Sequence, residues 1–250
     1  MNYEDALKEV VALARTSGEI LMKHWPGAGA TTKKEIKEDG TSISVADYES
    51  DAFLSKSLSK LFPDIAYKSE ESEQGMSADC SKLWIVDPLD GTTSFLNGKD
   101  DFSVLIALCE QNQVTLSVMY FPVHDRMVTA IRGGGAFSNG QPLTVSANSE
   151  LTGARLYCRN FVPPIEYTHN QMDSGKALLS LCDGKLDAIV MEAARFGEHD
   201  YAAPSLVIEE SGGTITDQKG ARMLFNANMP EVEYIIATNS VLHEHTLRFL

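Results

Sequence analysis

The chain lacks the features by which membrane-spanning, disulfide-rich and repeat proteins are identified. No run of about 18 apolar residues occurs in it, and charged residues interrupt its first apolar stretch, unlike the apolar segment of a secretory signal. No repeat of roughly 20–50 residues is present. The four cysteines lie far apart without a Cys-x-x-Cys pair, so we expect reduced, packed thiols at Cys80, Cys109, Cys158 and Cys182. These absences predict a globular protein of the cytoplasm.

Positive charge is also scarce. Lysine and arginine together number 21 against 35 aspartates and glutamates, which gives a net charge of −14. Such a chain repels nucleic acid and anionic membranes, so we expect neither as a partner. It repels a phosphorylated metabolite equally, and phosphate chemistry would therefore need bound cations. Part of the carboxylate excess could serve to hold them.

Hydrophobic spacing predicts a mixed α/β fold. The N-terminal part has helical spacing over residues 6–21 and 45–61, and short apolar or β-branched runs predict strands at 83–86, 103–108, 114–120 and 127–131. Later helices are predicted at 174–182, 201–211 and 241–250, with strands at 188–191 and 234–237. Strands beside helices without strict βαβ alternation indicate an α+β layered arrangement. We expect an N-terminal lobe over residues 1–150 and a C-terminal lobe over 151–250.

The sharpest chemical signal is the segment Asp87-Pro88-Leu89-Asp90-Gly91-Thr92-Thr93. A buried strand leads into it, and we expect that strand to end at Pro88, which cannot donate a ladder hydrogen bond. Asp87 and Asp90 are close enough to raise each other's pKa unless a cation lies between them. Clustered carboxylate oxygens suit Mg²⁺. Gly91 allows close backbone approach to an anion, and two threonines at an expected helix start offer amides and hydroxyls.

Other motifs permit weaker interpretations. Haloacid dehalogenase phosphatases also use an Asp-Gly-Thr turn, but their nucleophilic Asp lies two residues before the second Asp, whereas the spacing here is three. The triplet Gly133–Gly135 has no P-loop surroundings and predicts a hairpin corner. Paired Glu70 and Glu71 could form a solvated surface or a metal site. Asp200 could be a helix N-cap or a ligand, and His199 beside it a loop histidine, a ligand or an acid–base group.

Together these segments resemble the inositol monophosphatase family of metal-dependent, lithium-sensitive phosphatases. The resemblance is carried by the paired Glu, by the Asp-Pro-Leu-Asp-Gly-Thr turn and by Asp200-Tyr201-Ala202-Ala203 leading to Glu210-Ser211-Gly212-Gly213. Lys37, Asp39 and Ser44-Val45-Ala46-Asp47 are similar to further family motifs. The resemblance implies a five-layer αβαβα sandwich of the sugar phosphatase type and a homodimer. It also implies two to three Mg²⁺ ions and hydrolysis by an activated water without a covalent intermediate.

The resemblance also implies a role for each site residue. The implied metal ligands are Glu70, Asp87, the Leu89 carbonyl, Asp90 and Asp200. Gly91, Thr92 and Thr93 would hold the phosphate, and the implied catalytic residues are Glu70, Thr92 and Asp47, with Asp47 orienting the Thr92 hydroxyl. Ser174, Lys176 and Glu198 are expected to contact the leaving group.

The chain departs from the family pattern at three places, of which the last two lie in the half that usually shapes the leaving-group pocket. Ser69 stands where the family usually has Gly, His199 stands where it has Trp, and residues 159–173 form a short stretch. Inositol monophosphate is the first expected substrate, with Asp173, Ser174 and Glu198 as hydroxyl partners. A 3′(2′),5′-bisphosphate nucleotide is the alternative, with Phe196 beside Lys176 or Arg195, and histidinol phosphate or a sugar bisphosphate follows. A role mainly as a protein-binding regulator stays open.

Overall fold

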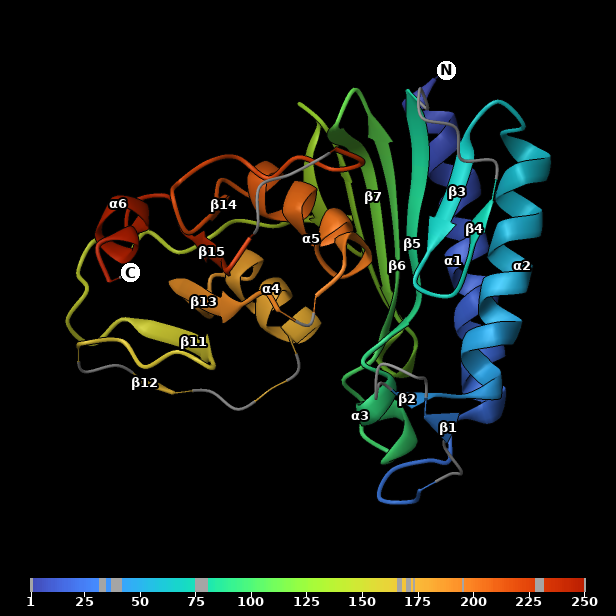
Figure 1. Cartoon of the computed structure of the whole chain (residues 1–250), viewed down its shortest axis with the longest axis horizontal. Helices are drawn as coiled ribbons and strands as arrows, with labels where there is room; N and C mark the ends of the chain where they lie inside the picture. Colours follow the sequence, from blue (N-terminus) through green and yellow to red (C-terminus); the bar gives the residue numbers. More distant parts are fainter. Residues whose placement is uncertain are drawn as a thin grey trace.

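Five layers make up the fold of the computed structural model (Figure 1). It describes residues 2–31, 35–36, 42–74, 81–165, 168–169, 172, 174–194, 196–227 and 232–249. Helices α1 (Tyr3–His24) and α2 (Val45–Leu61) cover one face of an eight-stranded sheet. Helices α4 (Ser174–Cys182) and α5 (Glu198–Glu210) lie between this sheet and a five-stranded sheet, and α6 (His243–Leu247) lies beyond the second sheet. The predicted αβαβα sandwich is confirmed.

The two large sheets differ in topology. The eight-stranded sheet has the order β10-β9-β8-β7-β6-β5-β3-β4 and is antiparallel except where β3 and β5 run parallel. Its strands are β3 (Ala66–Ser69), β4 (Glu73–Gln74), β5 (Lys82–Asp90), β6 (Ser103–Glu110), β7 (Gln113–Phe121), β8 (Arg126–Ile131), β9 (Gly135–Ser138) and β10 (Gln141–Pro142). The five-stranded sheet has the order β12-β11-β13-β15-β14. Its strands are β11 (Arg155–Arg159), β12 (Thr168–His169), β13 (Ala188–Glu192), β14 (Thr214–Asp217) and β15 (Tyr234–Thr238).

Smaller elements complete the chain: β1 (Glu35–Ile36) pairs with β2 (Ser42–Ile43), α3 is Thr92–Leu96, and a 3₁₀ helix covers Pro122–His124. The predicted helices 45–61 and 174–182 are confirmed with the same bounds. The glycine triplet forms the corner between antiparallel β8 and β9, as expected. Helix α5 begins three residues before the predicted start, and α6 is shorter than predicted. Strands β11 and β14 were not predicted, because each is short and is stabilised by neighbours distant in the sequence.

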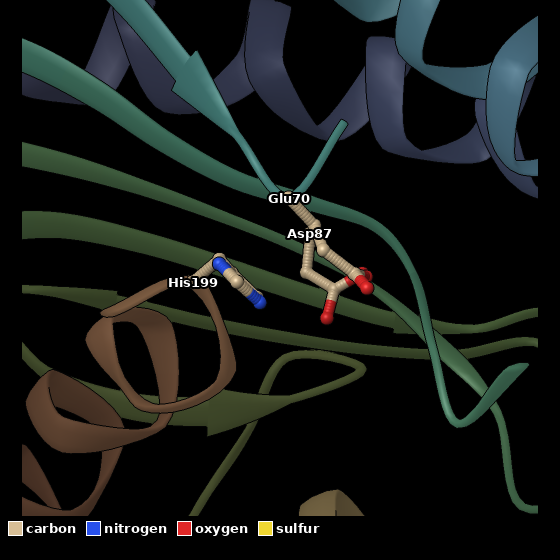
Figure 2. Close-up of side chains that lie close together, drawn as sticks. All are labelled: Glu70, Asp87 and His199. Carbon is tan, nitrogen blue, oxygen red and sulfur yellow. The ribbon is translucent and has the colours of Figure 1, made fainter. Parts of the chain in front are cut away.

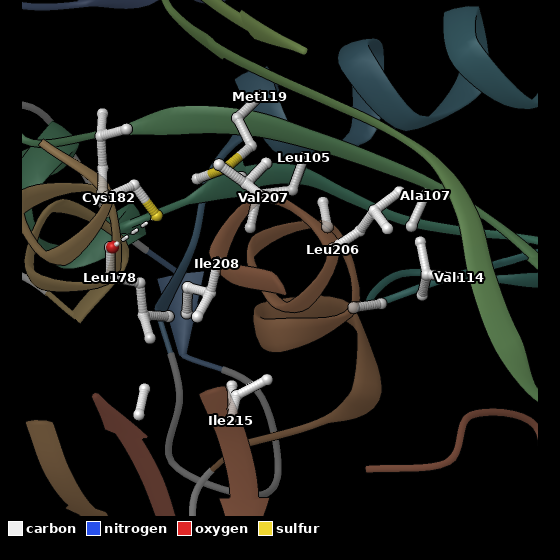
Figure 3. Packing of buried hydrophobic residues seen from close by; sticks show 14 of the residues in the cluster. Leu105, Ala107, Val114, Met119, Leu178, Cys182, Leu206, Val207, Ile208 and Ile215 are labelled. Carbon is white, nitrogen blue, oxygen red and sulfur yellow. Dashed lines mark hydrogen bonds between the residues drawn. The ribbon is translucent and has the colours of Figure 1, made fainter. Parts of the chain in front are cut away.

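Alternation along the central strands sorts their side chains between two apolar cores. On β6, Val104, Ile106 and Leu108 pack with α1 and α2, whereas Leu105 and Ala107 face the middle helices. Figure 3 shows the second core, where Leu206, Val207 and Ile208 of α5 lie among side chains of both sheets and of α4. Burial on both faces explains the nearly continuous apolar runs of these strands.

The packed core also contains the cysteines that the structure describes. Cys109, Cys158 and Cys182 are buried, and burial raises the pKa of the Cys182 thiol to about 12. Cys80 lies outside the described residues. Among the described helices, none is both long enough and apolar enough to cross a bilayer.

Strand β5 does not end at Pro88, contrary to the sequence-based prediction. It continues to Asp90 through a bulge, because Asp87 pairs with Leu105 of β6 and Asp90 pairs with Ser103, so three steps on β5 match two on β6. The neighbouring strand β3 pairs with β5 only as far as Val86, so Pro88 lies beyond that ladder and its missing N–H removes no bond there. The extra residue reverses the alternation, and it turns Asp87 and Asp90 toward one side of the sheet.

The change of sheet falls between β10 and β11, near the expected lobe boundary at residue 150. We propose this boundary between lobes 1–150 and 151–250, although one apolar core joins both sheets across it.

Candidate active site

Three aspartates from two separate parts of the chain meet at the end of β5. Asp87 and Asp90 flank the bulge, and Asp200 comes from the first turn of α5. One carboxylate oxygen from each lies within 4.8 Å of one from each of the others. A cation with ligands at 2.0–2.1 Å in octahedral geometry has opposite ligands about 4.2 Å apart. The arrangement therefore fits a small divalent cation with little adjustment.

Electrostatics at this cluster favour a bound cation. Asp87 is 1% exposed, and burial raises the pKa of its carboxyl well above the usual range, helped by the charges of Glu70, Asp90 and Asp200. The Leu89 amide donates to Asp87 Oδ1 at 3.0 Å, which opposes the shift in part. Ser103 Oγ donates to Asp90 Oδ2 at 2.9 Å and fixes that side chain. A divalent ion would offset the repulsion that these hydrogen bonds leave.

Asp200 is held by the helix that carries it. The N-cap of α5 is Gly197, so the alternative that Asp200 is itself the N-cap is wrong. Asp200 is the third helical residue, and its Oδ2 accepts a hydrogen bond from the Gly197 amide at 2.6 Å in a capping box. The helix therefore begins before the predicted residue 201, because the side chain of Asp200 folds back on the chain.

A second group of possible ligands shares Asp87 with the first. Glu70 follows β3 and His199 lies at the start of α5, and Figure 2 shows both side chains directed toward Asp87. One oxygen or ring nitrogen from each of these three residues lies within 4.8 Å of the others. All four predicted carboxylate positions are thus brought together, with His199 added.

The loop that carries Glu70 is tied to α2 through a buried carboxylate that the sequence analysis missed. Asp51 is 8% exposed and accepts hydrogen bonds from Tyr67 (2.7 Å), Ser69 (2.6 Å) and Ser72 (2.8 Å). Ser69, the residue that replaces the family's usual Gly, therefore has a partner here. Asp51 follows Asp47 by four residues, and that spacing places both on one helix face, which is the signal that could have identified it.

Thr92 and Asp47 lie together as predicted. Thr92 Oγ1 is 3.1 Å from Asp47 Oδ1 and 3.1 Å from the Leu89 carbonyl oxygen, and its single hydroxyl hydrogen can be donated to one of them at a time. Asp47 Oδ2 accepts from the Ser44 amide at 2.8 Å and from the Ser44 hydroxyl at 2.7 Å. Burial raises the pKa of Asp47, while the bonds from Ser44 and Thr92 oppose the rise.

Gly91 is required by its backbone. Its φ of +83° lies in the left-handed region, and a Cβ there would lie 2.7 Å from the Asp101 carbonyl oxygen. The chain turns at Gly91 into α3, whose first residues are Thr92 and Thr93. The predicted helix start is confirmed, and the first amides of any helix lack partners within that helix. Thr93 is exposed.

The residues predicted to contact the leaving group already have partners within the protein. Ser174 accepts from Arg159 Nη1 at 2.8 Å, Lys176 pairs with Asp101, and Glu198 accepts from the Asn226 amide at 2.7 Å. A Cβ on Gly175 would lie 2.2 Å from Asp90 Oδ2, so the start of α4 packs directly against the carboxylates. Of the other predicted residues, Lys37, Asp39, Asp173 and Arg195 lie outside the described residues.

Comparisons with known proteins agree with this geometry. The model of the inositol monophosphatase family matches residues 2–249. An inositol-1-monophosphatase of Mesorhizobium japonicum is 31% identical over 97% of this chain and 94% of its own length. A fructose-1,6-bisphosphatase/inositol-1-monophosphatase of Thermotoga maritima is 29% identical over 98% of this chain and 95% of its own length. The solved structure of the extragenic suppressor protein suhB from Bartonella henselae matches with a TM-score of 0.84 at 27% identity, covering 98% of this chain and 97% of that one. The chain is therefore a phosphoric monoester hydrolase that belongs to the inositol monophosphatase family.

Proposed function

We propose that this protein uses Mg²⁺ to hydrolyse the phosphate monoester of a small soluble metabolite, with inositol monophosphate as the first substrate. The convergence of Asp87, Asp90 and Asp200 in one small volume carries the proposal. These carboxylates, with Glu70 and the Leu89 carbonyl, would hold two to three ions. When bound, the ions supply an activated water as nucleophile and stabilise negative charge on the phosphate and on the leaving oxygen.

The chain's own residues would orient the reaction. Asp47 Oδ2 is occupied by Ser44, so Oδ1 is available to accept the Thr92 proton. A Thr92 hydroxyl that donates to Asp47 presents its lone pairs to an incoming water and accepts a hydrogen bond from it. Glu70 would accept the proton that this water loses. The Gly91 turn and the first amides of α3 would bind the phosphate oxygens, with Thr93 beside them.

The proposed substrate rests on relatives and on the residues near α4. The Mesorhizobium relative is named for inositol-1-phosphate chemistry, and Ser174 and Glu198 offer oxygens for polyol hydroxyls. One observation favours a bisphosphorylated alternative, such as a 3′(2′),5′-bisphosphate nucleotide. The Arg159 guanidinium lies 4.9 Å from the Phe196 ring centroid and donates to Ser174, so its partners in the described structure are uncharged. A second phosphate could pair with it.

A panel of substrates tests both proposals. The purified protein would receive Mg²⁺ and either inositol-1-phosphate, adenosine 3′,5′-bisphosphate, fructose-1,6-bisphosphate or histidinol phosphate, and released phosphate would be measured. We expect the highest kcat/KM for inositol-1-phosphate, and Asp90→Asn as a matched control should abolish release from every compound. Preference for a bisphosphate, lost through a higher KM in Arg159→Gln, would favour the alternative. Release from none of them would contradict the proposal.

Assembly and partner binding are further proposals. We infer a homodimer in the cytoplasm and no nucleic-acid partner, on the family resemblance and the net charge of −14. Light scattering would give the mass in solution, and a monomer at micromolar concentration would contradict the dimer. The match to a structure named as a suppressor protein keeps a protein-binding role open. That role alone, without catalysis, would be favoured if the substrate panel gave no release.

A further inference from the structure

The donor set formed by Glu70, Asp87 and His199 includes a nitrogen ligand. Figure 2 shows the imidazole of His199 directed from the start of α5 toward the two carboxylates. One donor atom from each residue lies within 4.8 Å of the other two. The neighbouring set of Asp87, Asp90 and Asp200 offers oxygen only. The two sets share Asp87, so they form two adjacent candidate cation positions that differ in donor chemistry.

Local geometry holds the imidazole in this place. A Cβ on Gly197 would lie 2.3 Å from His199 Cε1 and 2.7 Å from Nδ1, so the ring occupies space that any other residue at 197 would fill. His199 Nε2 lies 3.4 Å from Asp200 Oδ2, which places this nitrogen beside the carboxylate cluster. The side chain is 21% exposed. The ring is therefore positioned among the carboxylates rather than extended into solvent.

We propose that His199 is a nitrogen ligand to the cation held by Glu70 and Asp87, and that this position prefers first-row transition ions, for which Mn²⁺ serves as the probe, to Mg²⁺. The inference rests on the proposed metal-dependent function and specifies the metal chemistry of that site. Mg²⁺ prefers oxygen ligands and retains waters, whereas imidazole suits first-row transition ions such as Fe²⁺, Ni²⁺ and Zn²⁺, a series in which Mn²⁺ binds most weakly. A Trp at this position, as the family pattern has it, offers only an N–H donor and cannot bind a metal. The oxygen-only position beside it would keep its preference for Mg²⁺.

Pulsed electron paramagnetic resonance of the full-length protein loaded with Mn²⁺ would test the nitrogen ligand. A directly bound imidazole gives a ¹⁴N coupling to the manganese electron spin. We expect this coupling in the wild-type protein and its loss in both His199→Gln and His199→Trp. The matched control is His245→Gln, because His245 is exposed on α6, away from the cluster, and this variant should keep the coupling. Coupling retained without His199, or missing from the wild type, would overturn the proposal.

Calorimetric titration with Mn²⁺ and Mg²⁺ supplies a second readout. Loss of the imidazole should weaken Mn²⁺ binding about 10-fold or more, with the Mg²⁺ dissociation constant changed less than about threefold. If the affinities for Mn²⁺ and Mg²⁺ fell by the same factor, selective ligation by the imidazole nitrogen would be contradicted. Thermal melts in chelator would identify any variant that fails to fold, and the Gln and Trp variants differ enough in size for one to serve if the other does not.

The outcomes separate this inference from the proposed function. Mg²⁺-dependent phosphate release without any ¹⁴N coupling would remove the role of His199 and leave the phosphatase proposal standing. A ¹⁴N coupling that depends on His199, in a protein that hydrolyses no compound of the substrate panel, would do the reverse.

Discussion

Replacing Asp87 by Asn should stabilise the protein when metal is absent and make it the less stable form when Mg²⁺ is present. Asp87 is 1% exposed, and burial and the charges of Glu70, Asp90 and Asp200 raise its pKa. An ionised Asp87 therefore costs folding free energy in chelator. Asn carries no charge, and its amide oxygen can still accept the 3.0 Å hydrogen bond from the Leu89 amide.

The expected size follows from the charges that surround this residue. One like charge at about 4 Å contributes about 4 kcal/mol of repulsion at an effective dielectric constant of 20, and each unit of raised pKa costs about 1.4 kcal/mol. Partial protonation of Asp87 in the wild type limits the gain in stability. We therefore expect Asp87→Asn in chelator at pH 8 to be about 2 kcal/mol more stable than the wild type. For a chain of this length, that is roughly 4–8 °C in Tm. Mg²⁺ at 1,000 times its Kd adds about 4.1 kcal/mol to the wild type alone, which reverses the order.

The pH dependence has a definite sign. A carboxyl whose folded pKa is raised above its ordinary 3.8 makes the folded state lose stability as pH rises from about 4 through that raised pKa. The metal-free wild type should show this decline, and Asp87→Asn should show a smaller one, because the raised pKa of Asp47 remains. Urea unfolding in chelator between pH 5 and pH 8 would measure the difference.

Asp187 provides the matched control, because it is also 1% exposed but is paired. Burial raises its pKa, yet hydrogen bonds from Arg155 and Ser146 outweigh that effect and bring the pKa to about 2. Asp187→Asn should therefore lose about 2 kcal/mol in chelator and in Mg²⁺ alike. Its stabilisation is present above pH 3.8 and is lost as pH falls toward 2. If Asp87→Asn behaved like this control in chelator, the cluster would not be a site of unbalanced negative charge.

Four further predictions concern the reaction. Asp90→Asn should lower kcat/KM at least about 100-fold and Glu71→Gln less than about 10-fold, and the opposite order would contradict the assignment of the paired Glu. Lithium at millimolar concentration should inhibit phosphate release, whereas unchanged turnover would argue against that family property. Lys176→Ala should change KM for a bisphosphate less than about threefold, since Asp101 already pairs with its charge; a larger rise would place Lys176 on the substrate. Asp51→Ala should raise the Mg²⁺ concentration needed for half-maximal activity while kcat at saturating Mg²⁺ is largely kept, and an unchanged Mg²⁺ titration would contradict its positioning role.

The fold and the carboxylates of the candidate site could be predicted because their signals are local. The apolar runs and helical spacing of residues 45–61, 103–108 and 174–182 lie within single elements, and tertiary packing did not override them. The Asp-Pro-Leu-Asp-Gly-Thr segment places two carboxylates close together in any compact fold. Recognition of the family then joined Glu70 and Asp200 to them, which spacing alone could not do.

What the sequence did not predict depends on contacts between distant elements. The prediction that β5 ends at Pro88 was wrong because Pro88 lies in a bulge, beyond the residues that pair with β3. The position of β3 depends on strand pairing and not on composition. The role of Asp51 depends on three hydroxyls from β3 and the loop after it, brought to α2 by the packing of the first core. No local pattern shows which hydroxyls Asp51 binds, although its four-residue spacing from Asp47 places both carboxylates on one face of α2.

The candidate metal site and the fold depend on each other. Asp87 and Asp90 come from the eight-stranded sheet, and Asp200 comes from α5, which packs between the two sheets. Apolar contacts of Leu206 and Val207 draw this helix onto the sheet, while repulsion among the three aspartates opposes the approach of its first turn. The apolar core lies along the helix, and the repulsion acts only at its N-terminal end. Cation binding should therefore order that first turn, with His199 and Asp200, more than it orders the rest of α5.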